Sequence, residues 1–380
     1  MNPIAMPFNH SRTISSVSFD PTGRLLAMGC TNGTVCVWSF YAKKLVYDEA
    51  FSSNSEITSI SWTFTGDAMI LMCGARDGSF IVSPSIQLAG EGKVIGHTIL
   101  RGHPSAVIKL VSLLFSLVSA AADELCMWSC PDGMPCERQM ICDASRVANG
   151  ASIVDIALAE SSFGVVIFFD NGVMLHYSLL TDSVIWSITN PNDYGVSFYL
   201  PGSLIVCTKH PLQLAMTGTE CPRIRQIAAD ATHCSHVEDS ENLFLIHTLD
   251  GNIMVWDAEL GDVLFYCDTR DFDKPIRKLA AYYNSRTQFL RIVACPETST
   301  ECVVWNLHRY SRKNPSAPTF IKWRDIEAGV PSMPKGMSER PRPRRIRKAA
   351  AAAASVALRR STRQRRVPAR FRPLPSGPVI

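Results

Sequence analysis

The chain repeats one unit of short apolar runs, and this repetition constrains its fold more than any other feature. In the first unit, three runs occupy residues 14–19, 25–28 and 35–38. Between them lie Asp20-Pro-Thr-Gly23 and Thr31-Asn-Gly33, which place proline second in a turn and Asn-Gly where the backbone needs a positive φ. A fourth run follows at residues 43–51. Each unit therefore predicts a four-stranded antiparallel sheet.

Seven such units can be aligned on the turn before the third run. Their equivalent residues are spaced by 39 to 49 positions: Trp38, Ser83, Trp128, Tyr177, Met216, Trp256 and Trp305. The turn itself is clear in four units, at Asn32-Gly33, Asp77-Gly78, Asn171-Gly172 and Asp250-Gly251. Unit five has the weakest pattern and rests on residues 203–208 and 212–216 alone.

The need to cover apolar surface determines the predicted architecture. One four-stranded sheet alone would leave both of its apolar faces exposed to water. Radial packing of repeated sheets covers both faces and leaves only short edges. We therefore predict an all-β, seven-bladed β-propeller over residues 1–330. Residues 3–9 and residues 318–323 both suit the outer strand that closes such a ring, and the pattern does not choose between them.

Two short motifs relate the repeats to a known family. Gly102-His103 before the third unit and Val255-Trp256-Asp257 after Gly251 resemble the signatures of WD40 repeats. The resemblance covers about residues 10–325, although only one true Trp-Asp pair occurs. It implies a propeller in which a histidine, a turn aspartate, a first-strand hydroxyl and a third-strand tryptophan form a buried network. The residues that match structural positions are His103, Asp123 and Trp128 in one blade, with the hydroxyl unassigned, and Trp38, Asp250, Trp256 and Trp305 elsewhere.

No motif points to catalysis. The sequence holds no GxxxxGK[ST], GxGxxG or GxSxG pattern. Its one cysteine cluster, Cys126, Cys130, Cys136 and Cys142, has gaps of four, six and six residues, whereas zinc sites favour thiolate pairs two to four residues apart. His233 and His236 flank Cys234. A metal or acid–base role for these histidines is conceivable, but we favour the interpretation that they are ordinary loop or strand histidines. We therefore predict no enzyme, no cofactor and no metal, with reduced cysteines buried in the core.

Charge divides the chain into two parts of opposite sign. Residues 335–380 hold 14 lysines and arginines against one acid, and the rest of the chain holds 24 basic and 33 acidic residues. Residues 331–380, rich in proline, arginine and alanine, are therefore predicted to be a disordered basic tail. Two basic clusters ten residues apart match the spacing of a bipartite nuclear import signal. The residues assigned to import or nucleic-acid contact are Arg342, Arg344, Arg345, Arg347, Lys348, Arg359, Arg360, Arg363, Arg365 and Arg366.

Three roles for this tail stay open. The first is nuclear import together with non-specific contact to nucleic-acid phosphates. The second is contact with an acidic partner surface or with the acidic body of this chain. The third is a solubilising tail without a specific role.

The sequence predicts a localisation and a general class of function for this protein, but not its specific partners. No secretory signal is visible, and the apolar stretch at residues 107–122 is 16 residues long and contains Lys109, too short for a membrane span. We predict a non-enzymatic protein-interaction scaffold of a larger nuclear complex, chromatin-associated or nucleolar, with no membrane and no small-molecule substrate. Residues 25–35 also resemble the first blade of WD40 subunits of histone-methyltransferase complexes. A weak partner-binding face is assigned to Arg12, Glu56, Lys274 and Arg277.

Two alternatives compete with the nuclear scaffold. One is a cytoplasmic adaptor, such as a substrate receptor of a ubiquitin ligase. The other is an enzyme built on a propeller scaffold, since a fold does not fix a function.

Overall fold

A computed structural model of the chain describes the residues given at the end of this paragraph. The chain divides into two compact units, Met1–Glu327 and Ala328–Ile380. The second unit, with every tail residue assigned above, lies outside the described residues. The described ranges are 4–5, 12–50, 54–65, 68–83, 98–113, 116–129, 137–144, 150–159, 163–190, 196–200, 203–207, 214–218, 222–227, 231–237, 240, 242–258, 261–268, 275–287, 289–297 and 302–307.

The first three repeats form the sheets that the sequence predicts. In each sheet four strands pair antiparallel in chain order. They are β2 (Ile14–Phe19), β3 (Leu25–Cys30), β4 (Thr34–Ser39) and β5 (Lys44–Ala50); β6 (Ile57–Thr65), β7 (Ala68–Ala75), β8 (Ser79–Ser83) and β9 (Thr98–Arg101); and β10 (Val107–Leu113), β11 (Ser116–Ala121), β12 (Glu124–Ser129) and β13 (Glu137–Asp143).

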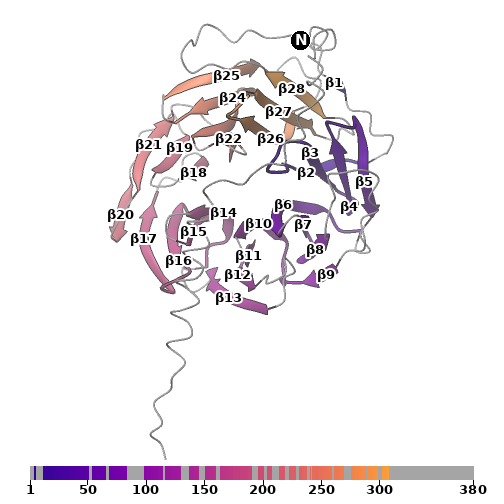
Figure 1. Ribbon diagram of the computed structural model, residues 1–380. Coiled ribbons are helices and arrows are strands. Elements are labelled where there is room, and N and C mark those ends of the chain that lie inside the picture. The colour runs from indigo at the N-terminus through magenta and orange to yellow at the C-terminus, as the bar shows by residue number, and fades with distance from the viewer. Residues whose placement is uncertain are drawn as a thin grey trace, which may run out of the picture. The chain divides into compact units, whose positions relative to one another are not determined.

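The later repeats continue the ring, which Figure 1 shows as sheets standing around a common axis. The fourth sheet holds β14 (Ile153–Ala159), β15 (Gly164–Phe169), β16 (Val173–Ser178) and β17 (Ser183–Thr189). The sixth holds β22 (Ala231–His236), β23 (Leu243–Thr248), β24 (Asn252–Asp257) and β25 (Asp262–Asp268), and the last holds β26 (Ile276–Asn284), β27 (Phe289–Pro296) and β28 (Val303–Leu307).

Unit five departs from the prediction. Residues 212–216 were expected to give its third strand, but β20 (Ala215–Gly218) pairs with β17 of the fourth sheet, with Met216 opposite Ile188. The remaining sheet has β18 (Val196–Leu200), β19 (Ser203–Cys207) and β21 (Arg223–Ile227), and β21 runs parallel to β19. Unit five lacks the Asn-Gly or Asp-Gly turn that would return the chain as an adjacent antiparallel strand. The all-β propeller is confirmed, but the described residues form six regular blades rather than seven.

A strand from the N-terminal end of the chain closes the ring. β1 (Ile4–Ala5) pairs antiparallel with β28, Ile4 opposite Val304 and Ala5 opposite Val303. The last sheet therefore has the order β1-β28-β27-β26. Of the two predicted closing segments, residues 3–9 contain the strand that pairs, and residues 318–323 lie outside the described residues.

Burial along the strands reflects radial stacking. Every residue of β3 and of β15 is buried, because both faces of these strands are covered by neighbouring blades. The outermost strands β5 and β13 are largely exposed. One core cluster joins the first blade to the second and includes Val35, Val37 and Leu71. The apolar stretch at residues 107–122 forms β10 and β11, and among the described residues no helix is long and apolar enough to cross a membrane.

Two glycines let successive blades approach closely. A Cβ on Gly29 of β3 would lie 2.4 Å from Cγ2 of Ile57, the first residue of the next blade's inner strand. A Cβ on Gly74 of β7 would lie 2.4 Å from Cγ1 of Val107 at the same place one blade on. These positions are the matching points at which one blade's second strand meets the next blade's first strand.

We expect Gly29→Ala and Gly74→Ala each to lower the free energy of unfolding by about 1–3 kcal/mol, because the added methyl group overpacks a closed blade contact. Chemical denaturation monitored by tryptophan fluorescence measures the loss. Gly150→Ala separates crowding from backbone strain, since nothing lies within 4 Å of its Cβ position but its φ of 83° strains an alanine there, whereas Gly29 and Gly74 have no positive φ. Unchanged stability in both variants would contradict this account of blade spacing.

Candidate functional site

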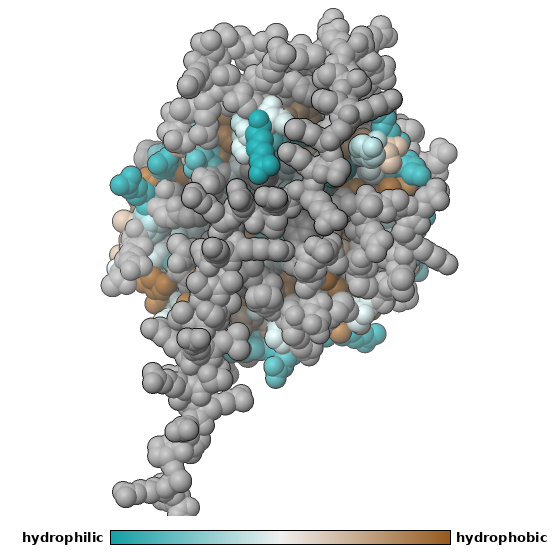
Figure 2. Space-filling model, in the orientation of Figure 1, coloured by the Kyte–Doolittle hydropathy of each residue, from teal (hydrophilic) through white to brown (hydrophobic). Residues whose placement is uncertain are grey.

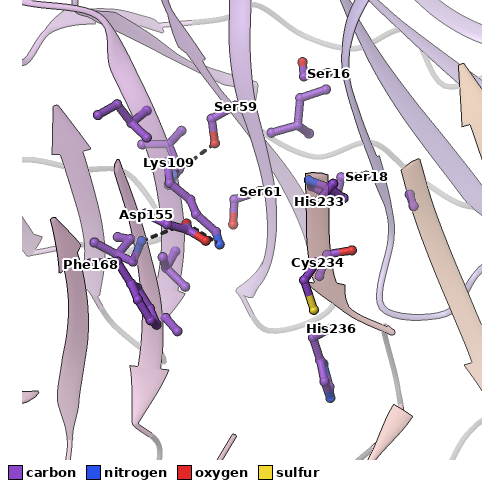
Figure 3. Close-up of a pocket in the computed structure, with 18 of the residues that line it drawn as sticks. Ser16, Ser18, Ser59, Ser61, Lys109, Asp155, Phe168, His233, Cys234 and His236 are labelled. Atoms are coloured by element: carbon purple, nitrogen blue, oxygen red, sulfur yellow. Dashed lines mark hydrogen bonds and ion pairs between the residues drawn. The ribbon is translucent and has the colours of Figure 1, made fainter. Parts of the chain in front are cut away.

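A central cavity of about 1120 Å³ runs between the inner strands of the blades. Its lining includes residues of β2, β6, β10, β14, β18, β22 and β26. Figure 3 shows part of this lining, with Lys109 and Asp155 on one side and His233, Cys234 and His236 on the other. Because the first strand of every sheet contributes, this cavity is the place where the whole ring converges.

A β-bulge recurs in the inner strands and sets the polar composition of the cavity wall. In six blades the pairing register shifts between the first and third residues of the inner strand. A bulge kinks the strand and re-aims a side chain. The residues that follow the bulge all line the cavity, and we call them the channel ring: Ser16, Ser59, Lys109, Asp155, His233 and Lys278.

On one side of the cavity, the channel ring bonds each blade to the next. Ser16 Oγ donates to the Ile57 carbonyl at 3.1 Å, and Ser59 Oγ accepts from the backbone N–H of Leu110 at 3.0 Å. Lys109 Nζ donates to Asp155 Oδ1 at 2.7 Å, a contact drawn in Figure 3. These bonds use the polar groups of blades one to four for the assembly of the ring.

On the other side, the ring residues lack such bonds. His233 Nε2 is buried and has no hydrogen-bond partner among the described residues, and the same holds for Ser235 Oγ two residues later on β22. Burial lowers the pKa of His233 to about 4, and the charges of Lys278 and Lys109 add to this effect. Burial also lowers the pKa of Lys278, with Arg277 contributing, and no ion pair of Lys278 is recorded within the described ranges. This side of the cavity therefore carries a neutral imidazole and an ammonium group.

The depressed pKa of His233 predicts a pH-dependent stability. Between pH 6.5 and about pH 4 the unfolded chain binds a proton at this position and the folded chain does not, so stability falls as the pH falls. At pH 5 this one group should account for about 2 kcal/mol. We expect His233→Gln, which cannot titrate, to lose less stability than the wild type between pH 7 and pH 5. Denaturant unfolding at each pH measures the free energy of unfolding. The expectation would be contradicted if this free energy fell equally with pH in the variant and in the wild type.

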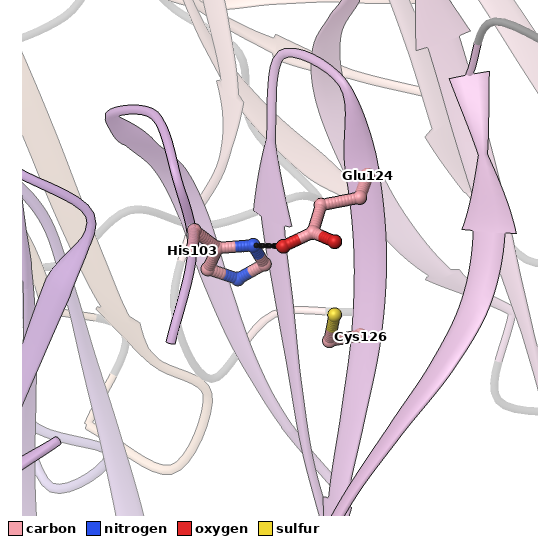
Figure 4. A group of neighbouring side chains, drawn as sticks. All are labelled: His103, Glu124 and Cys126. Atoms are coloured by element: carbon pink, nitrogen blue, oxygen red, sulfur yellow. Dashed lines mark hydrogen bonds and ion pairs between the residues drawn. The ribbon is translucent and has the colours of Figure 1, made fainter. Parts of the chain in front are cut away.

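Blade three holds a buried hydrogen-bonded network. Ser119 Oγ on β11 lies 2.7 Å from His103 Nε2 and accepts from Trp128 Nε1 at 2.8 Å. His103 Nδ1 contacts Glu124 Oε1 at 2.8 Å, as Figure 4 shows, and Arg138 donates to the same carboxylate at 2.5 Å. The network ties the loop before β10 to the second and third strands of the blade.

The sequence assigned the acid of this network to Asp123, and the structure corrects that assignment. Asp123 Oδ1 accepts instead from Ser105 Oγ at 2.7 Å, in an exposed position. Glu124 is the first residue of β12, and its longer side chain reaches the imidazole from there. The hydroxyl was expected on the first strand, but Ser119 lies on the second. Neither residue was identified from the sequence, because the signature used for the assignment specifies an aspartate in the turn.

His103, Glu124 and Cys126 also lie close enough together to hold a metal ion. Both ring nitrogens of His103 are already in contact with Glu124 and Ser119. The Arg138 guanidinium donates a hydrogen bond to the Glu124 carboxylate. Burial raises the pKa of the Cys126 thiol to about 11. These contacts fit a structural network better than a cation site, because a metal requires deprotonated ligands and would meet a fixed positive charge.

Comparisons with known proteins agree with this architecture. The family model for the WD domain, G-beta repeat, matches residues 2–39. The β-propeller domain of Cps50 (Swd1) from Myceliophthora thermophila superposes with a TM-score of 0.55 and 14% identity, covering 80% of this chain and 99% of that one. The family match therefore extends over the first repeat, and the likeness to this solved structure shows a β-propeller fold. Raptor from Chaetomium thermophilum is similar over 77% of this chain and 28% of its own length, with a TM-score of 0.56 and 12% identity.

Sequence similarity to curated proteins covers a shorter segment. The ribosome biogenesis protein ERB1 of Chaetomium globosum is 34% identical over 76 residues, and that of Chaetomium thermophilum is 32% identical over 76 residues. Each match covers 20% of this chain and 10% of the relative. The chain thus spans about a tenth of the length of these relatives.

The charged residues assigned to the rim of the propeller fall into separate places. Arg12 NH1 donates to Asp48 Oδ1 at 2.6 Å within blade one. Glu56 accepts from Arg76 at 2.9 Å and from Arg277 at 2.7 Å, and the second bond joins the second blade to the last. Lys274 lies outside the described residues. The structure therefore brings Glu56 and Arg277 together and leaves Arg12 in its own ion pair.

The three most exposed large apolar side chains in the described part of the propeller lie apart from one another. The large side chains of Tyr41, Leu180 and Leu249 are exposed, but each lies in a turn of a different blade. In Figure 2, hydrophilic and hydrophobic described residues are interspersed around the edge of the ring. A partner that contacts these described residues at the edge would therefore meet a mixed surface.

The remaining assigned tryptophans and the described cysteines contribute to the packing of the blades. Trp38, Trp256 and Trp305 lie in core clusters between blades, and Asp250 is exposed in the turn before β24. Cys126 and Cys142 belong to different clusters, so their thiols diverge as predicted, and Cys130 and Cys136 lie outside the described residues. The described free cysteines are all buried: Cys30, Cys36, Cys73, Cys126, Cys142, Cys207, Cys234, Cys295 and Cys302.

Proposed function

We propose that this protein is a non-enzymatic scaffold that binds other proteins in a complex of ribosome assembly, in the nucleolus. The observation that carries the proposal is the similarity of 76 residues to ribosome biogenesis proteins, placed on a WD40 propeller. A propeller offers a rigid ring with loops from every blade at its ends, which suits the binding of several proteins at once. The sheet β18-β19-β21 is, in this proposal, a degenerate seventh blade that completes the ring.

The geometry of the charged and polar groups supports binding better than chemistry. His103, Glu124 and Arg138 bond to one another and hold blade three together. Lys109 and Asp155 form an ion pair between two blades. Since general acid–base or nucleophilic catalysis needs such groups to be available to a substrate, these residues are better explained as parts of the scaffold.

The basic tail supports a nuclear setting in this proposal. Residues 335–380 carry 14 basic residues in two main clusters, and a ribosome-assembly complex presents abundant RNA phosphate. We propose that residues 331–380 form a separate tail segment that directs nuclear import and contacts phosphates without reading sequence. Contact with an acidic partner surface and a solubilising role remain the competing uses of the same charges.

We expect the joint replacement of Arg344, Arg345, Arg347 and Lys348 by alanine to weaken salt-dependent RNA binding. Each lost phosphate contact lowers the slope of log affinity against log salt by about 0.7 for single strands, so four should lower it by about 3. The same change in a reporter carrying residues 335–380 should abolish nuclear accumulation. Replacing Pro373 and Pro375 by alanine is the charge-neutral control. An unchanged slope and an unchanged nuclear reporter would contradict both tail roles.

Two other settings are distinguished by the partners that co-purify with the protein. Chromatin subunits would favour the chromatin-associated scaffold that the sequence also allows, although the names of the curated relatives point to ribosome assembly. Ubiquitin-ligase components together with a cytoplasmic location would favour the adaptor. Ribosome-assembly factors are the result that the proposal expects.

A further inference from the structure

We propose that the unbonded side of the channel ring, formed by His233 and Lys278, is together with Ser235 of β22 a binding site for one carboxylate group. The inference concerns the interior of the propeller and does not depend on which complex the protein joins. It rests on three observations: an asymmetry in the ring, two orphaned polar atoms, and a ring lysine that has no ion pair among the described residues.

The asymmetry comes from a comparison of equivalent positions. Every channel-ring residue follows the same bulge, so the six side chains start from matching points of the fold. In blades one to four these side chains are satisfied across a blade boundary, as Ser16, Ser59 and the Lys109–Asp155 pair show. In the last two regular blades the equivalent His233 and Lys278 have no such bond in the described structure. The residue after the bulge therefore bonds neighbouring blades together on one side of the cavity. On the other side the equivalent residues leave polar groups available to a ligand.

The two orphaned atoms share one strand. His233 and Ser235 are two residues apart on β22, so their side chains lie on the same side of the strand. A buried polar atom without a partner costs about 1–3 kcal/mol, and native structures keep such atoms where a ligand or a water pairs with them. Both residues line the cavity, and Figure 3 shows His233 on the wall opposite Lys109. A ligand in the cavity that accepts hydrogen bonds from both would remove this cost.

The charge balance selects the kind of ligand. Among the channel-ring residues, Asp155 forms an ion pair with Lys109, whereas Lys278 has no recorded ion pair in the described part of the wall, although the charges of Glu56 and Asp155 act on it. The wall also includes Asp170, which accepts from the backbone N–H of Ser152 at 3.0 Å. The six channel-ring residues therefore carry one more positive than negative charge. His233 is neutral near pH 7, since its pKa is about 4, and it can donate one N–H. One excess cation with neutral donors matches a monoanion. A dianionic phosphate would leave a buried negative charge unpaired, and a ligand cation would meet Lys278.

The site can be tested with the full chain labelled with ¹⁵N in its histidine rings. Acetate and the blocked peptide acetyl-Gly-Asp-Gly-amide are titrated against acetamide and acetyl-Gly-Asn-Gly-amide, which have the same shape without the charge. We expect saturable shifts of the His233 ring signal, assigned with His233→Gln, with the two carboxylates and not with the two amides. Tighter binding of the peptide would identify an acidic side chain of a partner as the source, and tighter binding of acetate a free carboxylic acid.

Variants test the roles of the two donors. Lys278→Met should weaken carboxylate binding at least tenfold, and Ser235→Ala should weaken it several-fold in a fold that stays intact. Lys44→Met, an exposed lysine on the outer strand β5, is the matched control and should leave binding unchanged. The inference is overturned if neither carboxylate gives a saturable shift, if inorganic phosphate binds more tightly than acetate, or if Ser235→Ala and Lys278→Met bind like the wild type.

Discussion

Replacing Ser119 by alanine should lower the free energy of unfolding by about 2–4 kcal/mol, although the change removes a single oxygen atom. The hydroxyl contacts both His103 Nε2 and Trp128 Nε1, and all three side chains are buried. Its loss removes one hydrogen bond from each of two buried ring nitrogens, and a buried polar atom that loses such a bond costs about 1–3 kcal/mol. Equilibrium unfolding in guanidinium chloride measures the difference.

Matched controls lie in the same blade. Ser105→Ala removes a hydroxyl–carboxylate bond to Asp123 in an exposed position and should cost less than about 1 kcal/mol. Glu124→Gln should be more destabilising than Asp123→Asn, because Glu124 contacts both His103 and Arg138. If Asp123→Asn were the more damaging change, or if Ser119→Ala had no effect, the network described for blade three would be wrong.

Removing β1, the strand that closes the ring, should also lower the free energy of unfolding substantially. Deleting residues 1–11 removes β1 and with it the backbone pairing to Val303 and Val304. Each lost backbone bond costs about 0.5–1.5 kcal/mol, so the loss of about two bonds should lower the free energy of unfolding by about 1–3 kcal/mol. The uncovered edge of β28 should also promote association at high protein concentration, because unpaired strand edges template pairing. Thermal unfolding and light scattering measure the two effects.

A variant of full length separates strand pairing from chain length. Ile4→Pro combined with Ala5→Pro keeps every other residue but removes both backbone donors of β1. It should reproduce most of the loss caused by the deletion. If the deletion and the double proline variant both unfold like the wild type, the N-terminal segment does not close the ring.

The repeated turns explain why most of the fold could be predicted from the sequence. Asn32-Gly33, Asp77-Gly78, Asn171-Gly172 and Asp250-Gly251 mark hairpins whose register depends on neighbouring residues only, and all four glycines have φ values between 77° and 82°. In unit five no such turn precedes Met216, so the pairing of its strand depends on contacts with β17 that are distant in the sequence. The regular blades were therefore predictable and the irregular sheet was not.

The candidate sites were less visible in the sequence for a related reason. Glu124 follows Asp123 directly, and only the direction of the two side chains decides which one reaches His103. The channel ring is assembled by a bulge in each inner strand, and residues such as Lys109 and Lys278 are 169 positions apart. An alignment of the units on the bulge rather than on the third-strand turn is the signal that could have identified the ring.

The most direct test of the proposed scaffold function is sedimentation of the tagged protein from a nuclear extract, followed by identification of the proteins that travel with it. We predict that the full chain sediments with large particles containing ribosome precursors and assembly factors, and that it accumulates in the nucleolus. A chain found only at the top of the gradient, in the cytoplasm and without stable protein partners, would contradict the proposal.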